Sequence, residues 1–148
     1  MKEQERFYQT LYTDPNPNIT DLENSPLFNV EHNALTEEQA ELCDQAITLE
    51  ECGKSLQDLA NNKTPGSDGF TTDFYKFFWK DIKALVFQSF EFAYKNGQLS
   101  LEQRRAILTL LQKLGKHIRF IKKWRPISHL NTDYKILTKF HANRIKKV

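Results

Sequence analysis

The chain turns sharply at Lys63-Thr64-Pro65-Gly66-Ser67-Asp68-Gly69. The Pro-Gly and Asp-Gly pairs in this stretch favour a tight, non-helical turn. From Thr71 onward, apolar residues recur at spacings of three and four, which predicts one long helix over residues 71–95. Further aromatic residues widen its apolar face, so we expect a central rod that is buried on more than one side. Asn96-Gly97 is a typical helix end.

Shorter helices are predicted before this turn. A stripe of mostly aromatic residues over residues 7–12 indicates one helix, and the two prolines that follow end it. Residues 14–33 indicate an irregular connector. Two acidic, amphipathic helices are predicted over residues 36–43 and 48–62, because each begins with a threonine that can cap it. Gln39 completes a capping box in the first of them.

After the long helix, the sequence indicates a small β-hairpin. The apolar run 106–111 predicts a buried strand, and residues 118–121 are a candidate for its partner. Residues 125–128 are expected to be extended, because the residue before a proline avoids the helical region. We therefore expect an antiparallel hairpin across residues 106–128.

A last helix is predicted to begin after Asn131, which is an N-cap candidate. We expect this helix to turn one set of residues inward, namely Tyr134, Leu137, His141 and Ile145. The residues expected to face outward are Lys135, Lys139, Arg144, Lys146 and Lys147. The predicted fold class is α+β, predominantly helical.

Charge is divided between two segments of the chain. Residues 1–103 contain 8 basic and 18 acidic residues, whereas residues 104–148 contain 13 basic residues and a single acid, Asp133. The aromatic residues interleaved with these cations are Phe120, Trp124, Tyr134 and Phe140. This combination is typical of a surface that faces nucleic acid. The alternative is a solvated basic face that balances the acidic half.

The sequence disfavours several other classes of protein. Its 148 residues suit one domain or one piece of a larger domain, and its apolar runs are far shorter than the roughly 18 residues of a membrane span. The polar N-terminus does not resemble a signal peptide, and two cysteines do not make a disulfide scaffold. We therefore expect an intracellular protein, cytoplasmic or nuclear. Neither zinc-ligand spacing nor a nucleophile elbow is present in the sequence.

The turn at residues 63–69 allows two interpretations. Glycine-rich backbone directly before a helix N-terminus can form an anion-binding concavity, to which Lys63 adds a charge. A plain turn between two helices is the alternative. The Gly-Lys-Ser/Thr ending of a Walker loop is absent from this stretch.

Two blocks of sequence carry a resemblance to a known family. The first is Pro65-Gly66-Ser67-Asp68-Gly69-Phe70, and the second is Trp124-Arg125-Pro126-Ile127-Ser128 followed by Asn131-Thr132-Asp133-Tyr134-Lys135-Ile136-Leu137. In this order and spacing, they resemble the start of the reverse transcriptase domain of non-LTR (LINE-type) retrotransposons. The resemblance implies an N-terminal extension over residues 1–62. It also implies a fingers part over residues 63–148, which holds the turn, the central helix and the basic segment.

The resemblance also implies binding residues. It places Lys63, Gly66, Ser67, Asp68 and Gly69 against the template strand. Lys122 and Lys123 of the basic segment are further candidates for template contact. Lys113 and Arg125 are implied to face the triphosphate of the incoming nucleotide, where an ammonium and a planar guanidinium can orient phosphate oxygens. For Arg125, a structural ion pair is the alternative.

The implied function is to bind template and nucleotide for an RNA-directed DNA polymerase. Its expected partners are an RNA template, a DNA primer, a deoxynucleoside triphosphate and a palm subdomain. The aspartates that hold Mg²⁺ in such enzymes are expected beyond residue 148, so this fragment alone is expected to be inactive and no catalytic or metal-binding residue is assigned in it. The alternatives are a non-catalytic nucleic-acid-binding or interaction remnant of a retroelement, or a fragment without a selected function.

Overall fold

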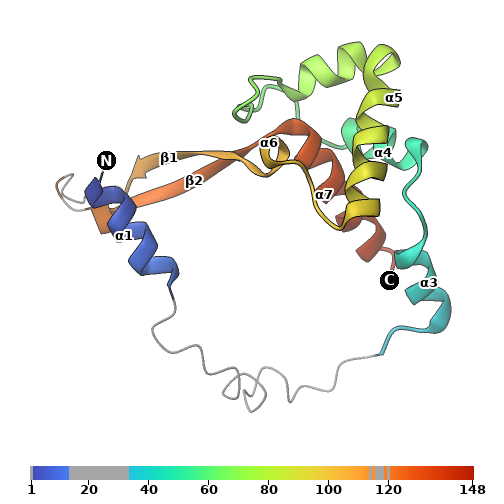
Figure 1. The fold of residues 1–148 in the computed structure, drawn as a ribbon, viewed down its shortest axis with the longest axis horizontal. Helices are drawn as coiled ribbons and strands as arrows, with labels where there is room; N and C mark the ends of the chain where they lie inside the picture. Colours follow the sequence, from blue (N-terminus) through green and yellow to red (C-terminus); the bar gives the residue numbers. More distant parts are fainter. Residues whose placement is uncertain (1, 14–33, 114, 116–118, 120) are drawn as a thin grey trace. The chain divides into compact units, whose positions relative to one another are not determined.

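The computed structural model describes residues 2–13, 34–113, 115, 119 and 121–148. The chain forms two compact units, of which one contains residues up to Ala34 with Leu111–Arg125, and the other contains Leu35–Leu110 with Pro126–Val148. Helices dominate the described residues, together with one two-stranded sheet (Figure 1), which confirms the predicted α+β class. The predicted connector over residues 14–33 lies outside the described residues. The predicted boundary between residues 62 and 63 stays a prediction.

The first unit contains helix α1 (Lys2–Tyr12), as the sequence predicted. Phe7 and Tyr8 are half-buried, and their rings meet edge to face with centroids 5.2 Å apart. Leu11 and Tyr12 at the end of the helix are exposed. Among the described helices, none combines the length and the apolar character needed to cross a membrane.

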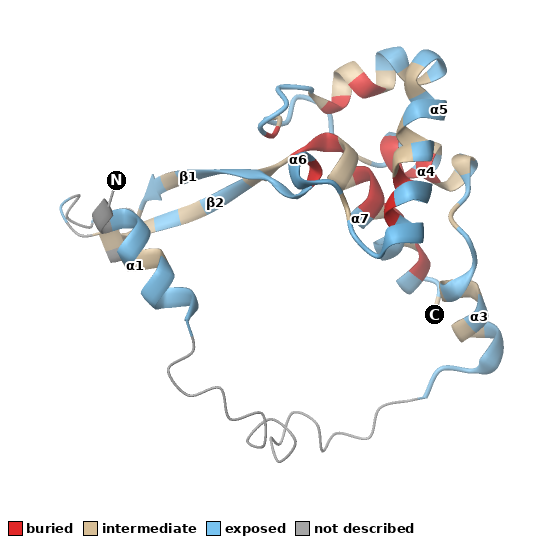
Figure 2. Ribbon diagram, viewed as in Figure 1, coloured by how far each residue is buried: buried red, intermediate tan, exposed pale blue. Residues whose placement is uncertain are grey.

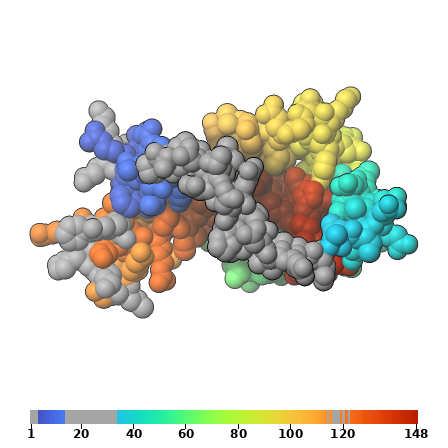
Figure 3. Space-filling model, turned by 90° about the horizontal axis from the view of Figure 1, so that it is seen from below, coloured from blue at the N-terminus to red at the C-terminus, as the bar shows by residue number. Residues whose placement is uncertain are grey.

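In the second unit, α3 (Glu37–Asp44) and α4 (Leu49–Gln57) begin where their threonine caps predicted. The Oγ1 atom of Thr36 accepts the backbone N–H of Gln39, and the Gln39 side chain accepts the N–H of Thr36, so the capping box is confirmed. α3 lies beside the C-terminal end of the chain (Figures 1 and 3), where the Gln39 amide donates to the carbonyl of Val148.

α4 ends at Gln57, several residues before the predicted end near residue 62. The ammonium of Lys76 donates to the carbonyls of Gln57 and Leu59, at 3.2 and 2.7 Å, and to the Asn61 side chain at 2.7 Å. These bonds satisfy carbonyl groups that the end of a helix leaves without partners. The cap therefore comes from a residue of the next helix, which local sequence does not reveal.

The long helix α5 (Thr72–Asn96) confirms the predicted rod, with Thr71 as its N-cap and Gly97 in the left-handed conformation at its end. Its burial differs from the prediction. Only Thr72, Tyr75, Phe90 and Ala93 of this helix are buried, whereas Phe77, Leu85 and Phe92 are 81%, 71% and 66% exposed. The expectation of burial on more than one side was wrong, because among the described residues α4 and α7 cover one side of α5 (Figure 2).

A one-turn helix, α6 (Leu101–Arg104), precedes strand β1 (Ala106–Gln112), which pairs with strand β2 (Trp124–Leu130). The hairpin and the extended conformation of residues 125–128 are confirmed. The candidate partner at residues 118–121 was wrong, because β2 takes that place and Ile121 belongs to a 3-10 turn (Ile121–Lys123); residues 118 and 120 lie outside the described residues. β1 is also not buried as predicted, since a two-stranded ribbon has no covering layer among the described residues.

The register of the hairpin follows from its backbone. The Lys113 N–H donates to the Lys123 carbonyl at 3.0 Å, directly beyond two strands of equal length. Leu111 therefore lies opposite Arg125, and Leu110 lies opposite Pro126. Pro126 has no N–H to donate. In this register its nitrogen lies on the side of β2 that faces away from β1, so the proline removes no bond from the ladder.

The last helix, α7 (Thr132–Ile145), completes the core of the second unit. The buried apolar residues of this core are Cys52, Leu56, Tyr75, Phe90, Ile136, Leu137 and Phe140 (Figure 2). The prediction of which α7 residues point inward and which point outward was only partly right. Leu137 points inward, but Arg144 is buried with 5% of its surface exposed, while His141 is exposed and Ile145 is 65% exposed.

Candidate nucleic-acid interface

The turn predicted at residues 63–69 is a compact loop with local hydrogen bonds. The Gly69 N–H donates to the Gly66 carbonyl at 3.3 Å, and the Asp68 carboxylate accepts the Phe70 N–H at 3.0 Å. Gly69 has a φ of 76°, a conformation that glycine adopts at little cost. The tight turn that the sequence indicated thus spans Gly66 to Gly69 and directly follows Pro65.

The side chain of Asn131 joins this loop to the start of α7. Its Oδ1 atom accepts the Ser67 hydroxyl at 3.2 Å and the Asp68 N–H at 3.4 Å. Its Nδ2 atom donates to the carbonyl of Glu102 in α6, at 3.0 Å. One buried amide therefore connects three segments that are far apart in the sequence.

Gly66 is in direct contact with the same residue. A Cβ atom at position 66 would lie 2.0 Å from the Asn131 Oδ1 atom and 2.4 Å from the Asn131 backbone nitrogen. No other amino acid fits this close approach, because such distances are far below van der Waals contact. The glycine of the first block therefore packs on the asparagine of the second block.

Two further hydrogen bonds hold the ends of the loop on α7. The Thr132 hydroxyl donates to the Phe70 carbonyl at 2.8 Å, and the Lys135 ammonium donates to the Thr64 carbonyl at 3.1 Å. The loop is thus bound at its start, middle and end. The residues that remain exposed on it include Lys63, Ser67, Asp68 and Gly69, which are four of the five template candidates of this loop, while Gly66 is buried.

The other candidate residues lie in the hairpin, within the first unit. Arg125 is exposed and Lys113 is half-buried. Leu111 lies opposite Arg125 and side chains alternate along a strand, so Lys113, two residues after Leu111, and Arg125 belong to the same face of the ribbon. Lys123 is half-buried, and Lys122 lies in the 3-10 turn with its side chain outside what the structure describes. The structure thus places the two nucleotide candidates on one surface.

Asp133, the single acid of residues 104–148, has hydrogen-bond partners other than Arg125. Its carboxylate accepts the Tyr134 N–H at 2.7 Å and a hydrogen bond from the Gln103 side chain. Burial raises the pKa of the Asp133 carboxyl above its ordinary value. Within the described part of the chain, no salt bridge involves Asp133.

The described residues do not offer a metal site or an activated thiol. No group of three or more histidine, cysteine, aspartate or glutamate side chains that could hold a metal ion is gathered among them. Burial raises the pKa of Cys52 to about 11, so this thiol stays protonated at neutral pH.

Comparison with known proteins adds one relative. No protein-family model matches the chain. It is 42% identical over 114 residues to the Transposon TX1 uncharacterized 149 kDa protein of Xenopus laevis. The chain is related to a transposon protein. The match covers 77% of this chain, which spans 9% of the length of that relative.

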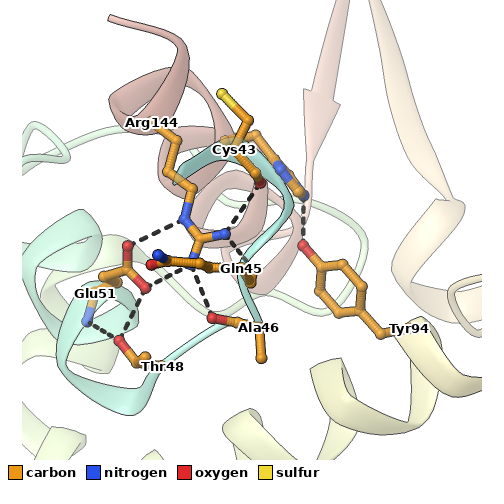
Figure 4. A network of polar contacts seen from close by, with 8 residues as sticks. Cys43, Gln45, Ala46, Thr48, Glu51, Tyr94 and Arg144 are labelled. Atoms are coloured by element: carbon orange, nitrogen blue, oxygen red, sulfur yellow. Dashed lines mark hydrogen bonds and ion pairs between the residues drawn. The ribbon is translucent and has the colours of Figure 1, made fainter. Parts of the chain in front are cut away.

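In this transposon-related chain, sequence reasoning missed one polar centre, the buried Arg144 (Figure 4). Its Nε and Nη2 atoms donate to the two oxygens of Glu51 at 3.1 and 2.9 Å. The other donations go to the backbone carbonyls of Cys43 in the last turn of α3 and of Gln45 and Ala46 in the link between α3 and α4. The guanidinium also lies over the Phe140 ring, 4.4 Å from its centroid. The Glu51 bond raises the pKa of Arg144 and lowers that of Glu51.

This network ties α7 to α3 and α4, so its role is structural. A signal for it exists in the sequence, because Leu137, Phe140 and Arg144 are spaced by three and four and so share one helix face. On the neighbouring face, the Tyr94 hydroxyl and the His141 Nε2 atom are 2.8 Å apart. Burial lowers the pKa of His141.

Proposed function

We propose that this chain is the N-terminal extension and fingers part of a reverse transcriptase of a LINE-type retrotransposon. In this role it binds the RNA template and the incoming nucleotide, and a palm subdomain supplies the catalytic aspartates. The observation that carries the proposal is the contact of Gly66 with Asn131. Gly66 of the first block and Asn131 of the second block are 65 residues apart in the sequence, and they pack against each other within the second unit.

The geometry suits template binding. Hydrogen bonds fix the 63–69 loop from behind, and the exposed edge carries the Lys63 side chain and glycine backbone that a nucleic-acid strand can approach closely. A preformed loop of this kind loses little conformational entropy when it binds. The relation to a transposon protein agrees with this origin.

The geometry also suits a nucleotide-binding role for the hairpin. Lys113 and Arg125 share one face of the ribbon, and Arg125 is exposed. A guanidinium and an ammonium on one surface can bind different oxygens of one triphosphate. Lys123 adds a third cation next to β2, in the 3-10 turn.

The test is binding of the full chain to a fluorescently labelled single-stranded RNA of 20 nucleotides between about 50 and 300 mM salt. We expect the logarithm of the association constant to fall linearly with the logarithm of the salt concentration. The double variant Lys122→Ala/Lys123→Ala should reduce the slope by about one to two, at roughly 0.7 for each phosphate contact on a single strand.

The matched control is Lys80→Ala/Lys83→Ala, which removes two exposed lysines of α5. This variant should leave the slope unchanged. Circular dichroism of each sample shows whether the helices are intact. A slope that is flat in the unmodified chain, or equal losses in the two double variants, would contradict the proposal.

A further inference from the structure

Asn131 occupies the N-cap position of α7, but its side chain does not cap that helix. An asparagine at this position ordinarily accepts a backbone N–H from the first turn. Here the Oδ1 atom is turned to the 63–69 loop, and the Asp133 carboxylate accepts the N–H of Tyr134 in the first turn. The side chain has therefore been diverted from the helix to the loop.

Both the oxygen and the nitrogen of the Asn131 side-chain amide form hydrogen bonds. Its oxygen accepts two donors of the loop, its nitrogen donates to the Glu102 carbonyl, and only 3% of the residue is exposed. This arrangement requires an acceptor and a donor on one planar group. Among the common N-cap residues, only asparagine provides both. A serine side chain is too short to bridge the loop and the Glu102 carbonyl, and an aspartate side chain lacks the N–H donor for that carbonyl.

From this geometry we infer that Asn131 is the positioning residue of the template loop. The inference rests on the proposed function, because it assigns to Asn131 the task of holding residues 66–69 in the conformation that meets the template strand. The bonds of Thr132 and Lys135 fix only the ends of the loop. Loss of the Asn131 side chain should therefore release the middle of the loop and leave its ends attached.

The first part of the test is amide hydrogen exchange on Asn131→Ser. Serine keeps the N-cap preference of α7, so the helix should remain folded, but its hydroxyl does not reach the loop. We expect the Asp68 amide to exchange about tenfold faster. The loss of one typical hydrogen bond should make the open state of the loop, from which exchange occurs, about tenfold more populated. Asn131→Asp keeps the acceptor but loses the donor to Glu102, so it should restore only part of the protection.

The matched control is Thr48→Ala, which removes the cap of α4 in the same unit without touching the loop. This variant should change the overall stability while the Asp68 amide keeps its exchange rate relative to the core amides. Equal exchange of Asp68 in Asn131→Ser and in the unmodified chain would overturn the inference.

The second part of the test measures RNA binding by Asn131→Ser and by Lys63→Ala, each alone and in combination. In the unmodified chain, Lys63→Ala should weaken binding of the labelled RNA about fivefold at 0.1 M salt, the worth of one phosphate contact on a single strand. Asn131→Ser should also weaken RNA binding, because the released residues 66–69 must be ordered again on the template strand. Lys63→Ala should cost about the same fivefold in this background, since Lys63 lies beside the attached start of the loop.

The outcomes separate the two claims. RNA binding that is unchanged in Asn131→Ser, while the salt dependence and the Lys63→Ala loss are retained, would overturn the positioning role and leave the proposed function intact. If the unmodified chain does not bind the RNA in a salt-dependent manner, the proposed function fails. The positioning role then fails with it, even if the exchange experiment shows that Asn131 fixes the loop.

Discussion

Gly66 packs so tightly against Asn131 that a Cβ atom on the glycine would lie 2.0 Å from the asparagine Oδ1 atom. The backbone nitrogen of Asn131 and the carbonyl carbon of Leu130 would be 2.4 and 2.6 Å away. Movement of the asparagine side chain could relieve the first clash but not the other two. The contact therefore constrains the backbones of both segments.

Gly66→Ala is expected to lower the free energy of unfolding by about 3 kcal/mol, the upper part of the usual range for overpacking. Urea denaturation measures this change. Gly97→Ala is the control, because Gly97 has a left-handed φ of 67° but open space around its Cβ position. That variant should lose about 1 kcal/mol. Equal losses at the two positions would show that close approach is not what matters at Gly66.

Arg144→Met is expected to destabilise the chain by about 3 kcal/mol, because it leaves Glu51 and three backbone carbonyls without their donor. Arg144→Lys should recover only part of this loss, since one ammonium cannot reach all of these acceptors. Arg105→Ala breaks an exposed ion pair with Glu102 and should change the unfolding free energy by at most about 0.5 kcal/mol. A small effect at Arg144 would contradict the structural role of the network.

The pKa of Asp133 is raised in the folded state, chiefly by burial. Its contribution to stability is therefore fully present below the unfolded pKa, near 3.8, and is lost as pH rises through the folded-state pKa. We expect Asp133→Asn to gain stability relative to the unmodified chain as pH increases from 3.5 to 7. Urea midpoints measured across this range provide the check.

Glu51 should show the opposite pH dependence. Its pKa is lowered, chiefly by the hydrogen bond from Arg144. The stability that it contributes is present above the unfolded pKa, near 4.5, and is lost as pH falls through the folded-state pKa. The deficit of Glu51→Gln should thus be greatest at neutral pH and shrink in acid. A deficit that grows in acid would refute this assignment.

Phe77→Ser should leave the stability of the chain within about 0.5 kcal/mol, because Phe77 is 81% exposed. Phe90→Ala on the same helix removes a fully buried ring and should cost about 3 to 5 kcal/mol. Thermal unfolding of the two variants distinguishes them directly. A large loss for Phe77→Ser would mean that this face of α5 is covered in solution.

Arg125→Ala tests the nucleotide site in the complete polymerase that we propose contains this chain. Removal of a charge-assisted contact to phosphate should weaken nucleotide binding by about tenfold or more and change template binding little. Single-nucleotide incorporation at varied nucleotide concentration measures the first quantity, and RNA binding measures the second. The reverse pattern would reassign Arg125 to the template.

Signals encoded by neighbouring residues were read correctly from the sequence. The caps at Thr36 and Thr48, the start of the long helix near Thr71 and the helix end at Gly97 all depend on residues within one turn, and each appears in the structure. The hairpin was also predicted, but its strand pairing was not. An apolar run fits several partners equally well, and only closure of the backbone ladder selects one.

Features that depend on distant partners were not predicted. Arg144 was predicted to face outward, because its acceptors lie about 100 residues earlier in the chain. The bond of Asn131 to the loop spans more than 60 residues, so helix periodicity assigned Asn131 only a capping role. The two blocks could be identified by resemblance, but their contact follows from the geometry of one amide.

Pro126 has a consequence for how the hairpin meets other polypeptides. Exposed strands with apolar side chains such as Ile107, Leu108 and Ile127 are templates for strand addition, which leads to aggregation. The outer edge of β2 lacks a hydrogen-bond donor at Pro126, because proline carries no N–H. A further strand that paired with this edge would lose a hydrogen bond at Pro126. The ribbon is therefore protected along one edge, and β1 provides the side on which a further strand can be added.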